Sequence, residues 1–144
     1  RPTNNYGIGQ YPEKLIPLSV KSLLRGRKIR LHNKGKPIRT WLHADDTAEA
    51  VMSIIDSGKV NEIYNVSGGF EQKNSKIIKS VIKHYFGDEI NWKDYVDFSY
   101  NRVGQDVRYS IDDSKLRSLG WEPKRLFDDE IERIVKFYKE NFIW

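Results

Sequence analysis

The sequence predicts a mixed α/β fold in a single compact unit. Apolar residues recur at helical spacing in several segments, short strand-like runs lie between them, and Gly or Pro marks most of the boundaries. Of the 144 residues, 38% are hydrophobic and 12% aromatic, which is enough to bury one ordinary core. Because the chain shows no internal repeat, low-complexity tract or linker, we expect one unit over residues 1–144.

The first third of the chain predicts one helix and two short strands. The opening ten residues are rich in turn formers, and Pro12 suits the first turn of a helix that Gly26 can end. Ile29–His32 and Ile38–Leu42 are strand candidates. The Gly- and Pro-containing segment between them predicts a turn.

A second helix and a third strand are expected next. Asp45 or Asp46 can cap the helix, and Gly58 can end it. Its predicted apolar face consists of Ala48, Val51, Met52 and Ile55. Residues Glu62–Val66 then predict a strand that leads into the Ser67–Gly69 loop.

The second half predicts further alternation of helices and strands. A third helix carries apolar residues over 77–85 and ends at Gly87, and Tyr95–Tyr100 predicts a strand. Residues 101–108 are polar and irregular. A short helix from Asp112 or Asp113 to Leu119 follows, and the last amphipathic helix is marked by Ile131, Ile134, Val135 and Tyr138.

Composition excludes several classes of site. The net charge of +5 favours anionic partners without selecting one, and the absence of cysteine excludes disulfides and thiolate metal sites. The three histidines, His32, His43 and His84, lack the spacing of common metal motifs. No apolar run approaches the roughly 20 residues that span a bilayer, and no signal segment opens the chain. We therefore expect a soluble, cytoplasmic protein with no metal, membrane or nucleic-acid partner.

The motifs of a complete dehydrogenase are missing. No G-x-G-x-x-G turn is present, and no tyrosine is followed by lysine four positions later. The chain starts with Arg1, and Met52 is its one methionine. We expect a truncated chain that cannot by itself catalyse hydride transfer.

Four segments, in order and spacing, resemble the carboxyl half of the extended short-chain dehydrogenase/reductase superfamily, and most closely its dTDP-glucose 4,6-dehydratase family. These segments are RPTNNYGIGQYPEKLIP, GKPIRTWLHADD, YNVSGG and NRVGQDVRYSID. The resemblance implies the carboxyl-terminal, substrate-binding portion of the fold, with mixed small sheets and helices and with the Rossmann core largely missing. It also implies that NAD is bound mainly by an absent amino-terminal domain, which carries the catalytic residues, and that the full-length parent is a homodimer.

The family converts dTDP-glucose to dTDP-4-keto-6-deoxyglucose and water. NAD takes hydride from sugar C4, water leaves across C5 and C6, and the hydride returns to C6. The implied partner of this chain is a nucleotide-diphosphate sugar.

The resemblance assigns the opening motif to the diphosphate and the cofactor. It places Asn5 at the sugar-nucleotide diphosphate, and Thr3 and Asn4 near the nicotinamide. The alternative from the residues alone is that asparagines in a turn bond their own backbone.

Lys14 and Leu15 match the pair that lines the nucleotide-base pocket of the family. On the sequence alone, Lys14 is equally compatible with a solvated first turn and Leu15 with ordinary core. His32 stands where the family often places tyrosine over the base, and a surface histidine is the alternative.

Arg39 matches the arginine that clamps the diphosphate, a role suited to a planar fork of donors, although strand alternation also allows it to face solvent. Asn65 matches an asparagine that contacts phosphate or ribose, and it also lies in a chance glycosylation sequon. Arg102 matches a further diphosphate-binding arginine. Gln105 replaces a histidine of the family pattern, so it can donate a hydrogen bond but cannot become cationic.

Two rival functions remain on the sequence alone. A UDP-sugar 4-epimerase or UDP-glucuronate decarboxylase shares the fold. A small basic phosphate- or RNA-binding module is less favoured, because the basic residues are interspersed with acids and no aromatic platform motif is present.

Overall fold

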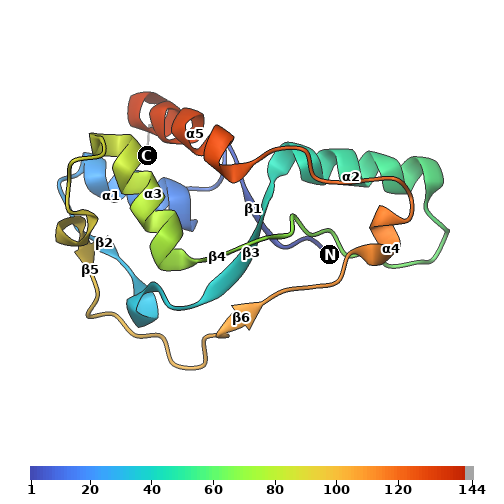
Figure 1. Cartoon of the computed structure of the whole chain (residues 1–144), viewed down its shortest axis with the longest axis horizontal. Coiled ribbons are helices and arrows are strands. Elements are labelled where there is room, and N and C mark those ends of the chain that lie inside the picture. The colour runs from blue at the N-terminus through green and yellow to red at the C-terminus, as the bar shows by residue number, and fades with distance from the viewer. Residues whose placement is uncertain (142–144) are drawn as a thin grey trace.

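The computed structural model describes residues 1–141 and confirms the mixed α/β architecture (Figure 1). The strands are β1 (Asn4–Tyr6), β2 (Ile29–Arg30), β3 (Ile38–His43), β4 (Phe70–Lys73), β5 (Val96–Asp97) and β6 (Arg108–Tyr109). The helices are α1 (Leu15–Leu24), α2 (Ala44–Ser57), α3 (Asn74–Phe86), α4 (Ser114–Arg117) and α5 (Phe127–Asn141). Short 3₁₀ turns occupy His32–Gly35 and Trp92–Tyr95.

Strand β3 organises the larger sheet. It pairs in parallel with β1 and β6 and antiparallel with β4, while β2 and β5 form a separate parallel pair. The sequence did not predict β1, because its Asn-rich segment favours turns and becomes a strand only through pairing of Asn4 with Trp41 of β3. The antiparallel strand β4 was missed as well.

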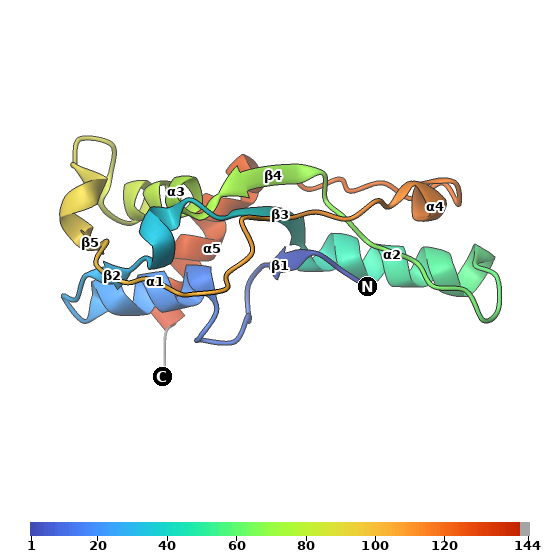
Figure 2. The same ribbon diagram turned by 90° about the horizontal axis from the view of Figure 1, so that it is seen from below.

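Helices α1, α3 and α5 pack together on one side of the molecule, whereas α2 and α4 extend away from them (Figures 1 and 2). The predicted amphipathic helix is confirmed in α5, which buries its apolar stripe in the main core. That stripe comprises Phe127, Ile131, Ile134, Val135 and Tyr138. None of the helices within residues 1–141 is long and apolar enough to cross a bilayer.

The start of α2 differs from the sequence prediction. His43, not an aspartate, caps this helix, because its Nδ1 accepts a hydrogen bond from the backbone N–H of Asp45 at 3.2 Å. Asp46 instead turns inward and is 1% exposed. The predicted apolar face (Ala48, Val51, Met52 and Ile55) lies exposed within the described residues, since no other element covers it.

Several other predicted boundaries were wrong. The strand expected over Ile29–His32 ends at Arg30, and His32 begins a 3₁₀ turn. The first helix begins at Leu15 because the Pro12 segment forms turns, and Tyr95–Tyr100 keeps only two strand residues. Glu62–Val66 is not a strand; only Val66 makes an isolated bridge, to Pro2. The polar stretch 101–108 is irregular up to β6, as predicted.

Candidate functional site

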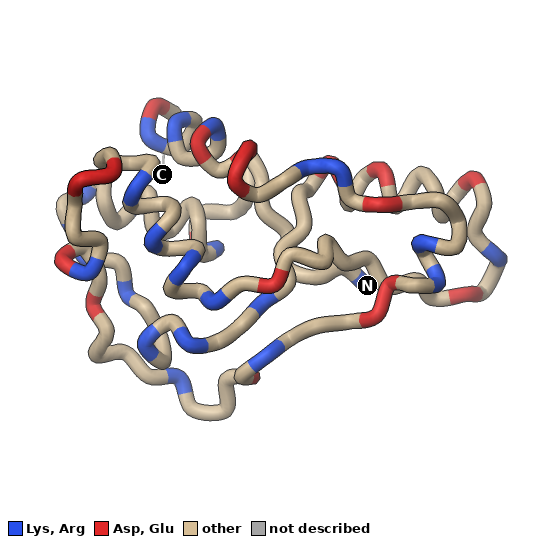
Figure 3. Tube along the Cα trace, in the orientation of Figure 1, with Lys and Arg blue, Asp and Glu red and all other residues tan. Residues whose placement is uncertain are grey.

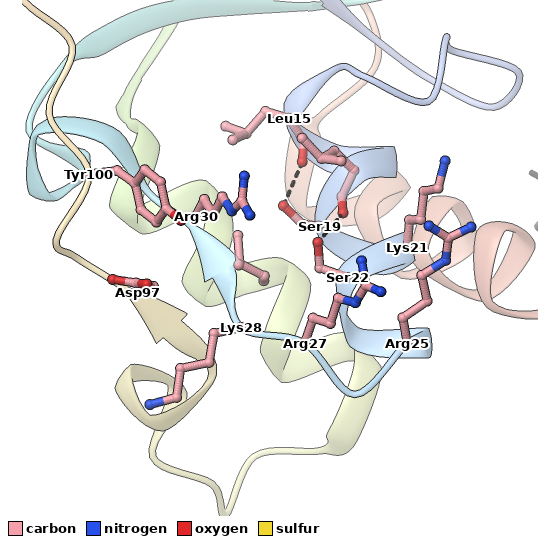
Figure 4. Close-up of a pocket in the computed structure, with 12 residues that line it drawn as sticks. Leu15, Ser19, Lys21, Ser22, Arg25, Arg27, Lys28, Arg30, Asp97 and Tyr100 are labelled. Carbon is pink, nitrogen blue, oxygen red and sulfur yellow. Dashed lines mark hydrogen bonds between the residues drawn. The ribbon is translucent and has the colours of Figure 1, made fainter.

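A cavity of about 650 Å³ lies between α1 and β2 (Figure 4). Leu15 and Ser19 line it from α1, and Arg30 and Tyr100 line it from the opposite side. The Arg30 guanidinium lies 5.0 Å from the centroid of the Tyr100 ring, and Figure 4 shows it directed toward the serines of α1. This arrangement places a cation and an aromatic ring on one wall of the cavity.

The cavity is strongly basic. Besides Arg30, its lining includes Lys21, Arg25, Arg27 and Lys28, and Asp97 is the acidic residue among the lining positions within the described chain. Hydrogen bonds from the hydroxyl and backbone N–H of Ser99 are the main cause that holds the pKa of Asp97 below its ordinary value. Such a lining favours an anionic ligand.

Next to this cavity, two segments that are far apart in sequence lie against each other and are joined by hydrogen bonds. We call this contact region the crossing. We call residues His32–Gly35 the Asn33 turn and residues 101–106 the site loop. Arg39 Nη1 donates to the backbone oxygen of Asp106 at 3.1 Å, and Asn33 bonds Arg102 and Gln105. Three of the predicted site residues, Arg39, Arg102 and Gln105, are thereby brought to one place.

The guanidinium groups of Arg39 and Arg102 have no carboxylate partner within ion-pair distance among residues 1–141. Arg108, in contrast, forks onto Glu71 of β4 with distances of 3.0 and 2.8 Å, which fixes β6 to the sheet. The charged residues of segments 33–39 and 101–108 are mostly basic: Lys34, Lys36, Arg39, Arg102 and Arg108 against Asp106 (Figure 3). The crossing therefore presents cations that remain available to an anion.

The opening motif is held by side-chain contacts that the sequence did not reveal. Asn5 Nδ2 donates to the oxygen of Thr3 at 3.1 Å, and Thr47 of α2 donates to Asn5 Oδ1 at 2.8 Å. The Asn5 amide therefore has a fixed orientation and one N–H left for a ligand. Thr3 is 5% exposed, and its hydroxyl has no hydrogen-bond partner among the described residues.

The predicted base-pocket residues lie in different surroundings. Leu15 lines the cavity, while Lys14 precedes α1 and pairs with Glu13 at 3.4 Å on the surface. His32 is exposed and packs edge-on against Tyr100, with ring centroids 5.9 Å apart. Sequence reasoning missed Arg30 and Tyr100, although the basic run Arg25–Arg30 was a visible signal.

Asn65 and Asn4 lie outside the crossing. Asn65 Nδ2 donates to the backbone oxygen of Asp112 at 2.8 Å, and no contact within residues 1–141 joins Asn65 to Arg39 or Arg102. Asn4 sits in β1 opposite Trp41. The structure thus separates the predicted residues into the crossing, the start of α1 beside the cavity, the opening segment and the Asn65 segment.

The fold and these motifs define the class. Residues 1–134 match the sequence model of the GDP-mannose 4,6 dehydratase family, and the chain belongs to that family.

Within the family, the chain is a homologue of the dTDP-glucose 4,6-dehydratases. It is 35% identical to dTDP-glucose 4,6-dehydratase 1 of Escherichia coli over 99% of this chain and 40% of the relative. A crystal structure of the Streptomyces venezuelae dTDP-glucose 4,6-dehydratase with NAD and a second ligand superposes with a TM-score of 0.89. That match has 37% identity and covers 98% of this chain and 43% of the other.

Epimerases share the fold at lower identity. The UDP-glucose 4-epimerase of Thermotoga maritima superposes with a TM-score of 0.83 at 23% identity, over 99% of this chain and 45% of the epimerase. The chain spans about 40% of the length of the curated dehydratases it matches.

Proposed function

We propose that this chain is the carboxyl-terminal, nucleotide-sugar-binding part of an NAD-dependent dTDP-glucose 4,6-dehydratase. The observation that carries the proposal is the crossing of the Asn33 turn and the site loop. It brings Arg39 and Arg102 together beside a basic cavity, and neither has a carboxylate partner among the described residues. The identity of 34–37% with solved dehydratases, against 20–23% with solved epimerases, favours the dehydratase over its same-fold rivals.

The chemistry assigned to this chain is binding and orientation. A diphosphate carries negative charge on several oxygens, and planar guanidinium groups can bond two of them at once. Arg39 and Arg102 hold the diphosphate, Gln105 and Asn5 add neutral donors, and Leu15 contributes an apolar contact at the cavity. Such remote binding energy fixes the sugar for reaction elsewhere.

The cofactor would be held for the most part by a domain outside this chain. Thr3 and Asn4 fit its edge, because the Thr3 hydroxyl is buried and has no partner among the described residues. Bound NAD supplies the hydride acceptor for oxidation at the sugar. This chain alone is expected to show no dehydratase turnover.

Titration of dTDP into the ¹⁵N-labelled chain tests the proposal, because chemical shifts detect weak binding. We expect saturable shifts at Arg39, Arg102 and Gln105 and around the α1–β2 cavity. The same titration into an Arg133→Lys variant is the control and should give the same shifts, since Arg133 pairs with Glu130 at the surface of α5. Shifts confined to other surfaces, or none at millimolar dTDP, would contradict the proposed function.

A further inference from the structure

Asn33 joins the two segments that form the crossing. Its side-chain Nδ2 donates to the oxygen of Arg102 at 3.1 Å and to Oε1 of Gln105 at 2.9 Å. Its Oδ1 accepts from the backbone N–H of Arg102 at 2.9 Å. Its own N–H donates to the oxygen of Tyr100 at 2.9 Å. Asn33 therefore makes three side-chain hydrogen bonds to the site loop and one backbone hydrogen bond to Tyr100, the residue just before it.

The backbone of Asn33 is held in a conformation that few residues tolerate. Its φ is 51° and its ψ 35°, and Lys34 follows with a φ of 56°. Asparagine occupies this left-handed region more readily than other residues with a Cβ, although still at a cost. Left-handed non-glycine residues persist where surrounding contacts determine them, and they concentrate at functional sites.

The site loop depends on Asn33 for its position. Arg102, Val103 and Gly104 are exposed, and Val103 is fully so. Within the described residues, no other side chain makes a hydrogen bond to residues 101–105. The loop is fixed at its far end by Arg39, which bonds the oxygen of Asp106. Asn33 holds the near end, where Arg102 lies.

From this geometry we infer that Asn33 is a positioning residue for diphosphate binding. It aligns the Arg102 backbone so that the Arg102 guanidinium and Arg39 face the same anion, and it orients the Gln105 amide. Accepting a hydrogen bond from Asn33 at Oε1 leaves the Gln105 NH₂ group free to donate outward. The inference rests on the proposed function, because it names the residue that arranges that site.

Asn33→Gly and Asn33→Asp separate the side-chain bonds from the backbone conformation. Glycine keeps the left-handed turn and removes all three side-chain bonds. Aspartate keeps the acceptor for Arg102 N–H and loses both donors. Asn61→Gly is the matched control, because Asn61 is also left-handed, with a φ of 62°, and makes no side-chain hydrogen bond among residues 1–141.

Affinity for dTDP is the first readout. We expect Asn33→Gly to weaken it about tenfold, Asn33→Asp at least as much because its carboxylate adds a negative charge beside the diphosphate, and Asn61→Gly not at all. In an Arg102→Ala background, Asn33→Gly should cost less than about twofold, because the residue acts through Arg102. An equal loss of dTDP affinity in both backgrounds would overturn the inference about Asn33 and leave the proposed function standing. So would unchanged affinity in Asn33→Gly when the wild-type chain binds dTDP.

Amide hydrogen exchange gives a second readout that needs no ligand. Exchange at the Arg102 amide should accelerate in Asn33→Gly and stay slow in Asn33→Asp and Asn61→Gly. Unchanged exchange at Arg102 in Asn33→Gly would overturn the positioning role even if dTDP binds. A different outcome would be faster exchange in Asn33→Gly together with a wild-type chain that does not bind dTDP. This would contradict the proposed function, and with it the role of Asn33 in diphosphate binding.

Discussion

The carboxylate of Asp46 accepts a hydrogen bond from Arg125 Nη1 at 2.6 Å, and it is 1% exposed. Its second oxygen accepts the backbone N–H groups of Lys124 and Arg125 at 3.2 and 3.0 Å. The buried start of α2 thus holds the segment that leads into α5.

Asp46→Ala should lower the free energy of unfolding by about 3 kcal/mol, because it leaves two backbone N–H groups without their acceptor and removes the buried carboxylate that pairs with Arg125. Arg125 keeps its contacts with Asp45 and Glu49 at 3.3 and 3.1 Å. Urea unfolding measures this. Glu62→Ala is the control: Glu62 pairs with Lys115 at the surface and should change the urea midpoint little. Equal midpoints for the two variants would contradict the structural role of Asp46.

Gly68 is required where its segment approaches β3. A Cβ added at Gly68 would lie 2.1 Å from the backbone oxygen of Trp41. Gly68→Ala should therefore destabilise the chain by about 3 kcal/mol, at the upper end of overpacking effects. Gly120→Ala is the comparison, because Gly120 has a φ of +86° but open space around it. It should cost only about 1 kcal/mol of backbone strain. Thermal unfolding that ranks Gly120→Ala as the more harmful change would contradict the close approach.

The exposed apolar face of α2 should cause the chain to self-associate. Val51, Met52 and Ile55 are 48%, 56% and 69% exposed. The double change Met52→Lys and Ile55→Lys should give a monomer with little binding of a hydrophobic dye, because it removes the contiguous apolar surface. Asp56→Lys alters the charge by the same amount on the same helix and should not prevent association. Sedimentation velocity of a wild-type chain that stays monomeric and dye-silent would count against this.

The sequence pattern predicted those elements whose secondary structure follows from their own residues. The apolar stripe of α5 predicted this helix, and α3 ends at Gly87 as expected. Strand β1 could not be predicted in this way, because its structure comes from pairing with β3. Likewise, the apolar pattern of α2 was visible, but whether the face is covered depends on what packs against it.

The candidate site divides in the same way. Arg39 and Arg102 were identified by resemblance, in motifs more than 60 residues apart in the sequence. The proximity of their two segments comes from the tertiary fold, which the motifs alone do not show. Asn33 was predicted only as part of a turn. Its bonds to Arg102 and Gln105 cross 69 and 72 residues of sequence, so no local pattern reveals them. The capping role of His43 escaped prediction because aspartates follow it and are the usual caps.

Arg39→Lys tests the central claim, that this chain supplies the diphosphate-binding site, most directly. Lysine keeps the positive charge but loses the planar fork, so affinity for dTDP and UDP should fall about tenfold at matched ionic strength, while the melting temperature stays close to that of the wild type. Calorimetric titration of both nucleotides into the two proteins measures it. Equal affinities of wild type and Arg39→Lys for both nucleotides would remove Arg39 from the site and contradict the account.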